Sequence, residues 1–199
     1  MQGKDTLTLI PTGGGKSILY TVSALLMQGL TVVVEPLKCF MEEQAEKLRH
    51  KQVPAFFYNS SLTEKEMDFT IDLLSRKELN MAILFTSPES LVSTKLQKLL
   101  TKWNDIQKLS FIAIDEARCI DIWGVGFRPD YLNLGSLKEF GVPLIALTGT
   151  ASPRNQKMII SVLQMDCPMV VKTSSSRSNL HLQVVQKASK QKKADCRFY

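Results

Sequence analysis

A glycine-rich stretch between an apolar β-like run and a helix-like run constrains the fold of this chain more than any other feature. The stretch reads Ile10-Pro11-Thr12-Gly13-Gly14-Gly15-Lys16-Ser17, after the run from Leu7 to Ile10 and before the run from Ile18 to Met27. Glycines let the backbone turn so that several N–H groups point inward, and a new helix adds unpaired donors and the positive end of its dipole. The sequence therefore predicts a phosphate cradle, in which Lys16 reaches the β- and γ-phosphates of a nucleotide and Ser17 holds Mg²⁺. The alternative is a flexible turn without a ligand.

Hydrophobic periodicity alternates between strand and helix along the chain. We expect strands at 5–10, 31–35, 55–58, 82–85, 109–114, 143–147 and 169–173, and helices at 16–28, 38–51, 63–76, 88–100 and 153–163. Repeated β-α alternation with apolar strands predicts an α/β fold, a mainly parallel sheet with helices on both faces. Ligands of such sheets bind at the carboxyl ends of the strands.

An acidic pair, Asp115-Glu116, directly follows the most strand-like run of the sequence, Leu109 to Ile114. Downstream of a phosphate loop, such a pair has a specific use in hydrolysis. Asp115 would hold Mg²⁺ opposite Ser17, and Glu116 would polarise the water that attacks the γ-phosphate. The alternative is that the two carboxylates only cap a following helix.

Length and composition favour one globular domain. The 199 residues are 44% hydrophobic and 22% charged, an ordinary balance for a chain with a buried core. No apolar run approaches the ~18 to 20 residues of a membrane span, and the N-terminus lacks a charged-then-apolar signal pattern. We therefore expect a domain at 1–175, an exit linker and basic tail at 176–199, no membrane partner, and a nuclear or cytoplasmic protein.

Charge and cysteine content are less informative. The net charge is +6, but five basic residues and one acidic residue follow Val184. A basic charge is compatible with a nucleic-acid partner, but a solvated lysine-rich tail would give much of the same charge. The four cysteines form no C-x-x-C pair, which argues against a zinc site and a disulfide framework. We expect reduced, mostly buried thiols.

Several short motifs, in their order along the chain, resemble those of superfamily 2 helicases. Motifs I, II and III correspond to Thr12-Gly13-Gly14-Gly15-Lys16-Ser17, Asp115-Glu116-Ala117-Arg118 and Leu147-Thr148-Gly149-Thr150-Ala151, and motifs Ia and Ib to Pro36-Leu37 and Thr86-Ser87-Pro88-Glu89. The run Trp123-Gly124-Val125-Gly126-Phe127-Arg128-Pro129-Asp130-Tyr131 resembles the aromatic-rich loop of RecQ-like DNA helicases, and Arg177-Ser178-Asn179-Leu180 resembles their domain exit. The resemblance covers residues 5 to about 187, and the aromatic loop is its most specific part.

The resemblance implies a RecA-like P-loop NTPase domain that binds ATP and Mg²⁺, and that drives 3′-to-5′ unwinding in a whole enzyme. Its partners would be single-stranded or partially duplex DNA and a second RecA-like domain absent from this chain. Trp123 and Phe127 would stack on bases, and Arg128 would meet phosphate. Alternatively, Trp123, Phe127 and Tyr131 are core aromatics. Coupling between the ATP site and the DNA loop would run through three residues, Arg118, Thr148 and Thr150.

Departures from the family pattern leave two hypotheses. Arg118 stands where a His is usual, Gly149 replaces Ala, and Ile122, Val125 and Gly126 replace Gln, His and Asp. An arginine finger from a second domain is worth about 10³ to 10⁵ in rate, so we expect slow hydrolysis by this chain alone. The chain is then either the ATP-binding half of a helicase or a non-catalytic nucleotide- or DNA-binding fragment or degenerate copy. An RNA helicase of the DEAD-box type is disfavoured by the run from Phe127 to Tyr131.

Overall fold

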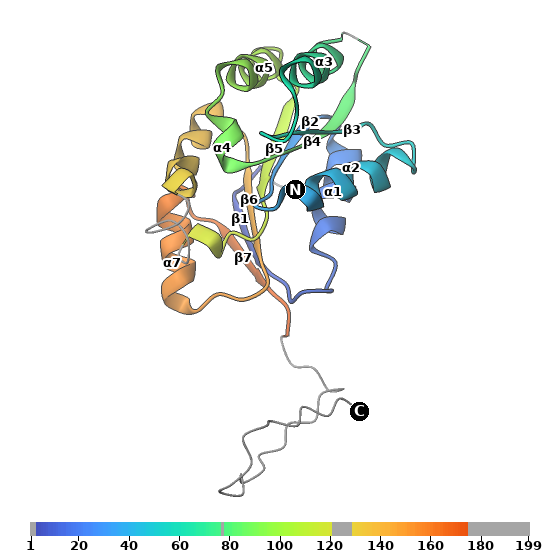
Figure 1. The fold of residues 1–199 in the computed structure, drawn as a ribbon. Helices are drawn as coiled ribbons and strands as arrows, with labels where there is room; N and C mark the ends of the chain where they lie inside the picture. Colours follow the sequence, from blue (N-terminus) through green and yellow to red (C-terminus); the bar gives the residue numbers. More distant parts are fainter. Residues whose placement is uncertain (1–2, 77, 121–128, 175–199) are drawn as a thin grey trace, which may run out of the picture.

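Strands and helices alternate along the chain, as the hydrophobic pattern predicts (Figure 1). The computed structural model describes residues 3–76, 78–120 and 129–174. The strands are β1 (Thr6–Leu9), β2 (Gly29–Val34), β3 (Ala55–Tyr58), β4 (Met81–Thr86), β5 (Leu109–Ile114), β6 (Leu144–Thr148) and β7 (Met169–Lys172). The helices are α1 (Lys16–Met27), α2 (Lys38–Arg49), α3 (Glu64–Leu74), α4 (Pro88–Leu91), α5 (Thr94–Asp105) and α7 (Pro153–Val162), with a 3-10 helix η1 (Pro129–Phe140).

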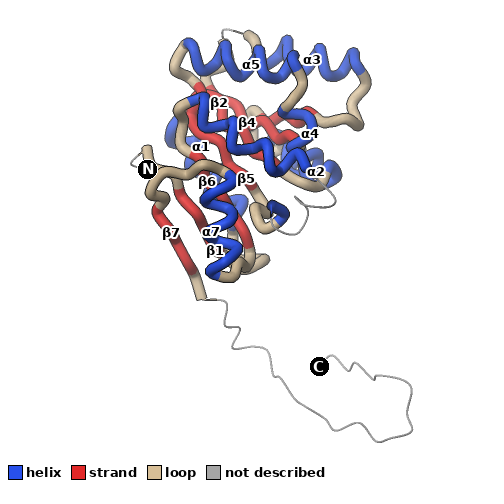
Figure 2. Tube along the Cα trace, turned by 90° about the vertical axis from the view of Figure 1, so that its left-hand side faces the viewer, coloured by secondary structure: helices blue, strands red, loops and turns tan. Residues whose placement is uncertain are grey.

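The seven strands pair in parallel, in the order β3-β4-β2-β5-β6-β1-β7. Alternate residues of each strand point to opposite faces, and both faces are apolar. Val32 lies in one buried cluster with Trp103 of α5 and Ile159 of α7, and Val33 in another with Tyr20 of α1 and Met41 of α2. Helices therefore cover both faces, with α3 and α5 side by side (Figures 1 and 2). The predicted α/β fold with a parallel sheet is confirmed.

Two elements differ from the sequence prediction. The helix expected at 88–100 is broken after α4, because Ser93 leaves the helical conformation and its side chain caps α5 by accepting from the Leu96 N–H at 3.3 Å. The 3-10 helix η1 was not predicted. Elsewhere local signals held: the capping box at the start of α3, formed by Thr63 and Glu66, is present.

The cysteine prediction was partly wrong. Cys39, Cys119 and Cys167 are free thiols, but Cys39 and Cys167 are exposed and only Cys119 is buried. Cys196 lies outside the described residues. None of the helices in 3–76, 78–120 and 129–174 combines the length and apolar character that a transmembrane helix needs.

A buried carboxylate, Asp5, joins the start of β1 to η1, to β6 and to the loop between α7 and β7. Its oxygens accept hydrogen bonds from Lys138 Nζ of η1 at 2.9 and 3.2 Å, from the Leu144 N–H of β6 at 2.9 Å, and from the Asp166 N–H at 3.1 Å. The Asp5 side chain is only 3% exposed. One side chain therefore satisfies an ammonium group and two backbone amides that lie far apart in the sequence.

We expect Asp5→Ala to lower the free energy of unfolding by about 2 to 4 kcal/mol, because it leaves a cation and two amides without their acceptor. Asp5→Asn retains one acceptor and the side-chain volume, so its loss should be smaller. Urea unfolding measures both. The matched control is Asp72→Ala, which breaks the exposed pair with Arg76 and should change stability by less than about 0.5 kcal/mol. Equal losses for the buried and the exposed site would contradict the prediction.

Candidate nucleotide-binding site

The glycine-rich stretch leaves the end of β1 and turns directly into α1. Gly13 and Gly15 have φ of 82° and 87°, in the left-handed region that favours glycine, and Gly15 is the N-cap of α1. A Cβ at Gly14 would lie 2.5 Å from Ile10 Cγ2 and 2.9 Å from the Pro11 carbonyl oxygen, so a side chain has no room there. The glycines thus produce a strand–turn–helix geometry, the arrangement in which helix-start N–H groups bind phosphate.

The acidic pair lies at the carboxyl end of β5. The Asp115 N–H donates to the Val34 carbonyl of β2 at 2.9 Å, and Asp115 Oδ1 accepts from the Glu116 N–H at 2.8 Å. Glu116 has φ of 46°, so the chain turns sharply where the strand ends. Its Oε1 lies 3.5 Å from Lys16 Nζ. The two predicted motifs, far apart in the sequence, therefore meet at one edge of the sheet.

Glu116 lies between two cations. Its second oxygen, Oε2, is 3.2 Å from Arg118 Nε. That oxygen is buried and accepts no hydrogen bond within the described part of the chain, so Arg118 meets it as a charge. The side chain of Lys16 is 11% exposed and that of Arg118 is 46% exposed, so water screens the Arg118 pair more strongly. Each cation therefore lies against one of the two oxygens through which Glu116 could act as a general base.

The third motif lies beside the glycine-rich loop. Thr148, at the end of β6, is fully buried, and its Oγ1 donates to the Thr150 carbonyl at 3.2 Å. A Cβ at Gly149 would lie 3.6 Å from Thr12 Oγ1 and 3.8 Å from Lys16 Nζ, which are ordinary contact distances. The predicted coupling residues Thr148 and Thr150 therefore flank Gly149, a position next to Lys16 at which alanine would fit.

A comparison with protein-family models matches residues 1–159 to the DEAD/DEAH box helicase family. The chain belongs to that family. Its parallel sheet, with the glycine-rich loop after β1 and the acidic pair after β5, is the RecA-like arrangement expected of such helicases.

RecQ helicases are among the curated relatives of this DEAD/DEAH box helicase chain. It is 36% identical to the RecQ-like DNA helicase BLM of Xenopus laevis over 98% of its own length and 14% of the relative. It is 38% identical to the ATP-dependent DNA helicase RecQ of a Synechocystis strain over 91% of its own length and 38% of the relative. The resemblance to RecQ-like helicases is confirmed, and the chain spans well under half of the length of these relatives.

Solved helicase structures share the fold at low sequence identity. The helicase MrfA in a crystal structure bound to DNA superposes with a TM-score of 0.66 at 19% identity, over 86% of this chain and 25% of that one. The Hef helicase domain of Pyrococcus furiosus gives 0.59 at 18% identity, over 85% of this chain and 36% of that one. At this identity the likeness establishes the fold alone.

Sequence analysis missed one residue of the site in this helicase domain, Glu35. It follows β2 directly, is 3% exposed, and accepts from the Leu37 N–H at 3.4 Å through Oε1. Burial, and then the charge of Asp115, raise the pKa of Glu35 to about 8. Burial likewise raises the pKa of Asp115, although the Glu116 N–H opposes the shift. The sequence feature that could have identified Glu35 is its place as a carboxylate directly after the uncharged run 29–34.

The predicted DNA-contacting residues Trp123, Phe127 and Arg128 lie outside the described residues. Tyr131, the last aromatic of that run, is 0% exposed and belongs to the core cluster shared by α5 and α7. The alternative of a core aromatic therefore holds for Tyr131.

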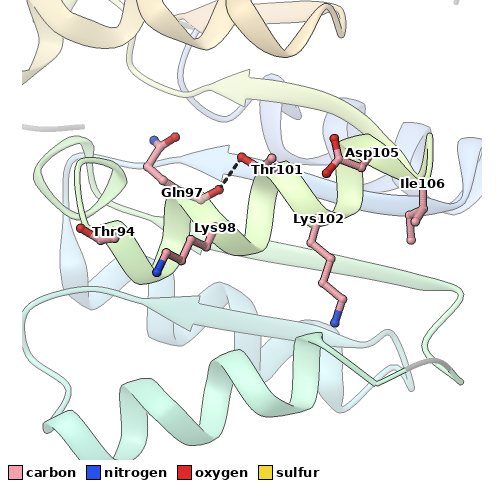
Figure 3. A pocket seen from close by; sticks show the side chains of 7 residues that line it. All are labelled: Thr94, Gln97, Lys98, Thr101, Lys102, Asp105 and Ile106. Atoms are coloured by element: carbon pink, nitrogen blue, oxygen red, sulfur yellow. Dashed lines mark hydrogen bonds between the residues drawn. The ribbon is translucent and has the colours of Figure 1, made fainter.

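A separate groove of about 520 Å³ follows the outer side of α5. Figure 3 shows its lining, with Lys98 and Lys102 extending from the helix and Thr101 Oγ1 donating to the Gln97 carbonyl at 3.0 Å. None of the predicted site residues lines this groove. It is therefore distinct from the edge of the sheet where Lys16 and Glu116 meet.

Proposed function

We propose that this chain is the ATP-binding and ATP-hydrolysing half of a RecQ-like DNA helicase. The observation that carries the proposal is the 3.5 Å approach of Lys16 Nζ to Glu116 Oε1, which joins a phosphate loop to an acidic pair at the carboxyl edge of a parallel sheet. That edge is where parallel α/β sheets bind their ligands. The names of the RecQ relatives, as DNA helicases, support the choice of DNA as the substrate.

In this proposal the loop residues Thr12 to Ser17 enclose the phosphates of ATP. Lys16 leaves Glu116 and pairs with the β- and γ-phosphates. Glu116, released from Lys16, orients the attacking water and accepts its proton. Thr148 and Thr150 hold the third motif against the loop. Arg118, through its contact with Glu116, couples the ATP site to the DNA loop.

The donor set fits Mg²⁺, which binds one or two carboxylates together with phosphate oxygens and water. Asp115 offers a buried carboxylate whose pKa is raised by burial, so a nearby cation would favour its ionised form. Ser17, in the first turn of α1, offers a hydroxyl. In the described part of the chain, no three or more His, Cys, Asp or Glu side chains form a metal site. Bound Mg²⁺ would neutralise charge on the phosphates.

The proposal extends to DNA and to a second domain. Single-stranded or partially duplex DNA would contact Trp123, Phe127 and Arg128, and unwinding would run 3′ to 5′ when a second RecA-like domain completes the motor. A nuclear or cytoplasmic location belongs to the same proposal, because DNA is the substrate.

Trp123→Ala should weaken binding of single-stranded DNA by about 5- to 150-fold, since stacking on one base contributes about 1 to 3 kcal/mol. ATP affinity should stay the same. Fluorescence anisotropy with a labelled oligonucleotide measures the first and a fluorescent ATP analogue the second. Trp103→Phe is the matched control, because Trp103 is buried and its Nε1 donates to the Leu74 carbonyl. Unchanged DNA affinity in Trp123→Ala would refute the stacking role.

The second candidate is a non-catalytic copy that binds nucleotide or DNA without coupling them. The contact between Arg118 and Glu116 favours it, because a guanidinium is always charged and only donates, whereas a neutral imidazole can also accept. The guanidinium would keep Glu116 from the water.

Arg118→His separates the two candidates. If Arg118 restrains Glu116, the substitution should raise DNA-stimulated ATP turnover several-fold, most clearly in a fusion to a RecQ second domain. Arg49→His, at the exposed end of α2, is the control for a change of charge. No rise in turnover in the fused protein would show that Arg118 does not limit hydrolysis.

A further inference from the structure

Helix α1 carries apolar residues both on the side that packs against the sheet and on its outer side. Tyr20 and Ala24 are its buried residues, and both lie in the cluster that the sheet shares with α2. Large apolar side chains on the outer side are exposed to water, at Ile18, Leu19, Val22, Leu25 and Leu26. The most exposed of them, Leu26, reaches 79%. Because a helix with apolar residues on both sides is typical of a buried position, this outer side is a candidate surface for a partner.

The exposed residues have the spacing of a helix-packing stripe. Ile18, Val22 and Leu25 follow one another at i, i+4 and i+7, so they lie on one face of α1. A second helix packs its own side chains between residues at these spacings. A strand would need backbone hydrogen bonds from its neighbour, and the side of a helix offers none, because its N–H and C=O groups are bonded within the helix. The stripe therefore fits a helix that lies along the 12 residues of α1, a length of about 18 Å.

A groove of about 490 Å³ lies between this stripe and α2, on the side of the sheet that both helices cover. The three stripe residues line it from α1, Leu48 lines it from α2, and Val53 lines it from the turn before β3. Leu48 and Val53 also pack against the buried cluster beneath, so these walls are anchored in the core. The groove is thus a preformed apolar depression that can receive the side chains of a partner helix.

The charges at the groove favour an acidic partner. Both charged residues that line it are basic, Lys47 on α2 and Lys51 just after α2. Lys47 pairs with Glu43, but the two side chains are 67% and 51% exposed, so water screens this pair and it contributes little. Lys51 pairs with no carboxylate in the described part of the chain. A partner with carboxylates beside its apolar residues would therefore be electrostatically complementary to the groove.

We propose that the groove between α1 and α2 binds an amphipathic helix of a partner protein, with acidic residues along one border of its apolar face. The apolar face packs on the stripe of α1, and the border carboxylates meet Lys47 and Lys51. Residues 175–199 of this chain match the groove less well, because they include six basic residues and one acidic residue. The proposal does not depend on nucleotide binding, so either of the two can fail while the other stands.

The test is the binding of two designed helical peptides to the 199-residue protein, measured by fluorescence anisotropy. Each peptide has about 18 residues, long enough for a helix to form in isolation, and carries leucines at i, i+4, i+7 and i+11. The two differ only at the border of the apolar face, which is glutamate in one peptide and lysine in the other. The glutamate peptide should bind at least about fivefold more tightly than the lysine peptide.

Variants of the groove locate the binding. Val22→Asp places a charge in the stripe and should weaken binding of the glutamate peptide by about tenfold or more, as expected for a central apolar contact. Leu25→Asp should have the same effect, which keeps the test decisive if Val22→Asp lowers the stability of α1. Lys51→Glu should remove most of the preference for the glutamate peptide, because it replaces an attraction with a repulsion.

Matched controls change the same kinds of side chain elsewhere. Val92, after α4, is 63% exposed, and Val92→Asp should leave the affinity for both peptides unchanged. Lys98 is an exposed lysine of α5, and Lys98→Glu should leave the preference between the peptides unchanged. Thermal unfolding of every variant measures any general loss of stability.

Three results would overturn the proposal. The first is equal affinity for the two peptides, or no binding of either. The second is full binding by Val22→Asp and Leu25→Asp, which would place the peptide elsewhere. The third is a dimer of the wild type in sedimentation equilibrium that Val22→Asp converts to a monomer, which would make a second copy of this chain the occupant of the groove.

Discussion

Lys16→Ala is expected to lower ATP affinity by roughly 10²-fold or more, since it removes a charge-assisted contact to the phosphates in a nearly buried site. The Lys16 side chain is 11% exposed and already pairs with a carboxylate, so its loss also leaves Glu116 with only the more exposed Arg118. ATP would then approach a negative charge that only the more exposed Arg118 balances. Isothermal calorimetry with ATP and Mg²⁺ measures the change.

The matched control for Lys16→Ala is Lys47→Ala. Lys47 lies on α2, pairs with Glu43 at 2.5 Å, and has a side chain that is 67% exposed. It lines a groove between α1 and α2, and it is not among the residues predicted to contact phosphate. ATP affinity within about twofold of the wild type is expected, because exposed pairs contribute little. If Lys16→Ala behaves like this control, the glycine-rich stretch is a turn and the phosphate cradle is wrong.

Glu116→Gln is expected to separate hydrolysis from binding. Loss of a general base typically lowers turnover by about 10² to 10⁴-fold, and glutamine keeps the shape of the side chain but accepts no proton at neutral pH. ATP affinity should hold or rise slightly, because the variant no longer competes with phosphate for Lys16. Phosphate release and calorimetry measure the two quantities.

Glu43→Gln, on the exposed side of α2, is the corresponding control and should leave turnover unchanged. The comparison also addresses the role of Glu35, the third carboxyl at this edge and, with Asp115, one of the two buried ones. Full turnover in Glu116→Gln would mean that another group acts as the base. Glu35 is the candidate, because its charge interacts with that of Asp115.

The sequence was sufficient for the sheet because strands of an α/β fold carry their own signal. β3 and β5 begin and end at the predicted residues, since both are short apolar runs bounded by turn or polar residues. The break between α4 and α5 was missed because the apolar spacing continues across it, whereas the break depends on Ser93 as a cap. The 3-10 helix η1 has little helical amphipathicity, so periodicity gave no indication of it.

The site was predictable to the level of motifs but not of contacts. Motif spacing and the order of elements implied that the loop after β1 and the pair after β5 share one edge, and Lys16 and Glu116 do meet there. The second cation on Glu116 was not predicted, because it depends on the turn that follows β5, where Glu116 has a positive φ. The burial of Glu35 and Tyr20 arises from packing between α1, α2 and the sheet, which sequence patterns do not specify.

ATP hydrolysis by the 199-residue chain, with and without single-stranded DNA and with Glu116→Gln as the blank, tests most directly whether Lys16 and Glu116 form a working site. We predict slow turnover that exceeds the blank and rises when DNA is added, because the loop and the acidic pair are already assembled. Turnover equal to the blank with and without DNA, in a chain shown to bind ATP, would contradict this and leave a nucleotide-binding module without catalysis.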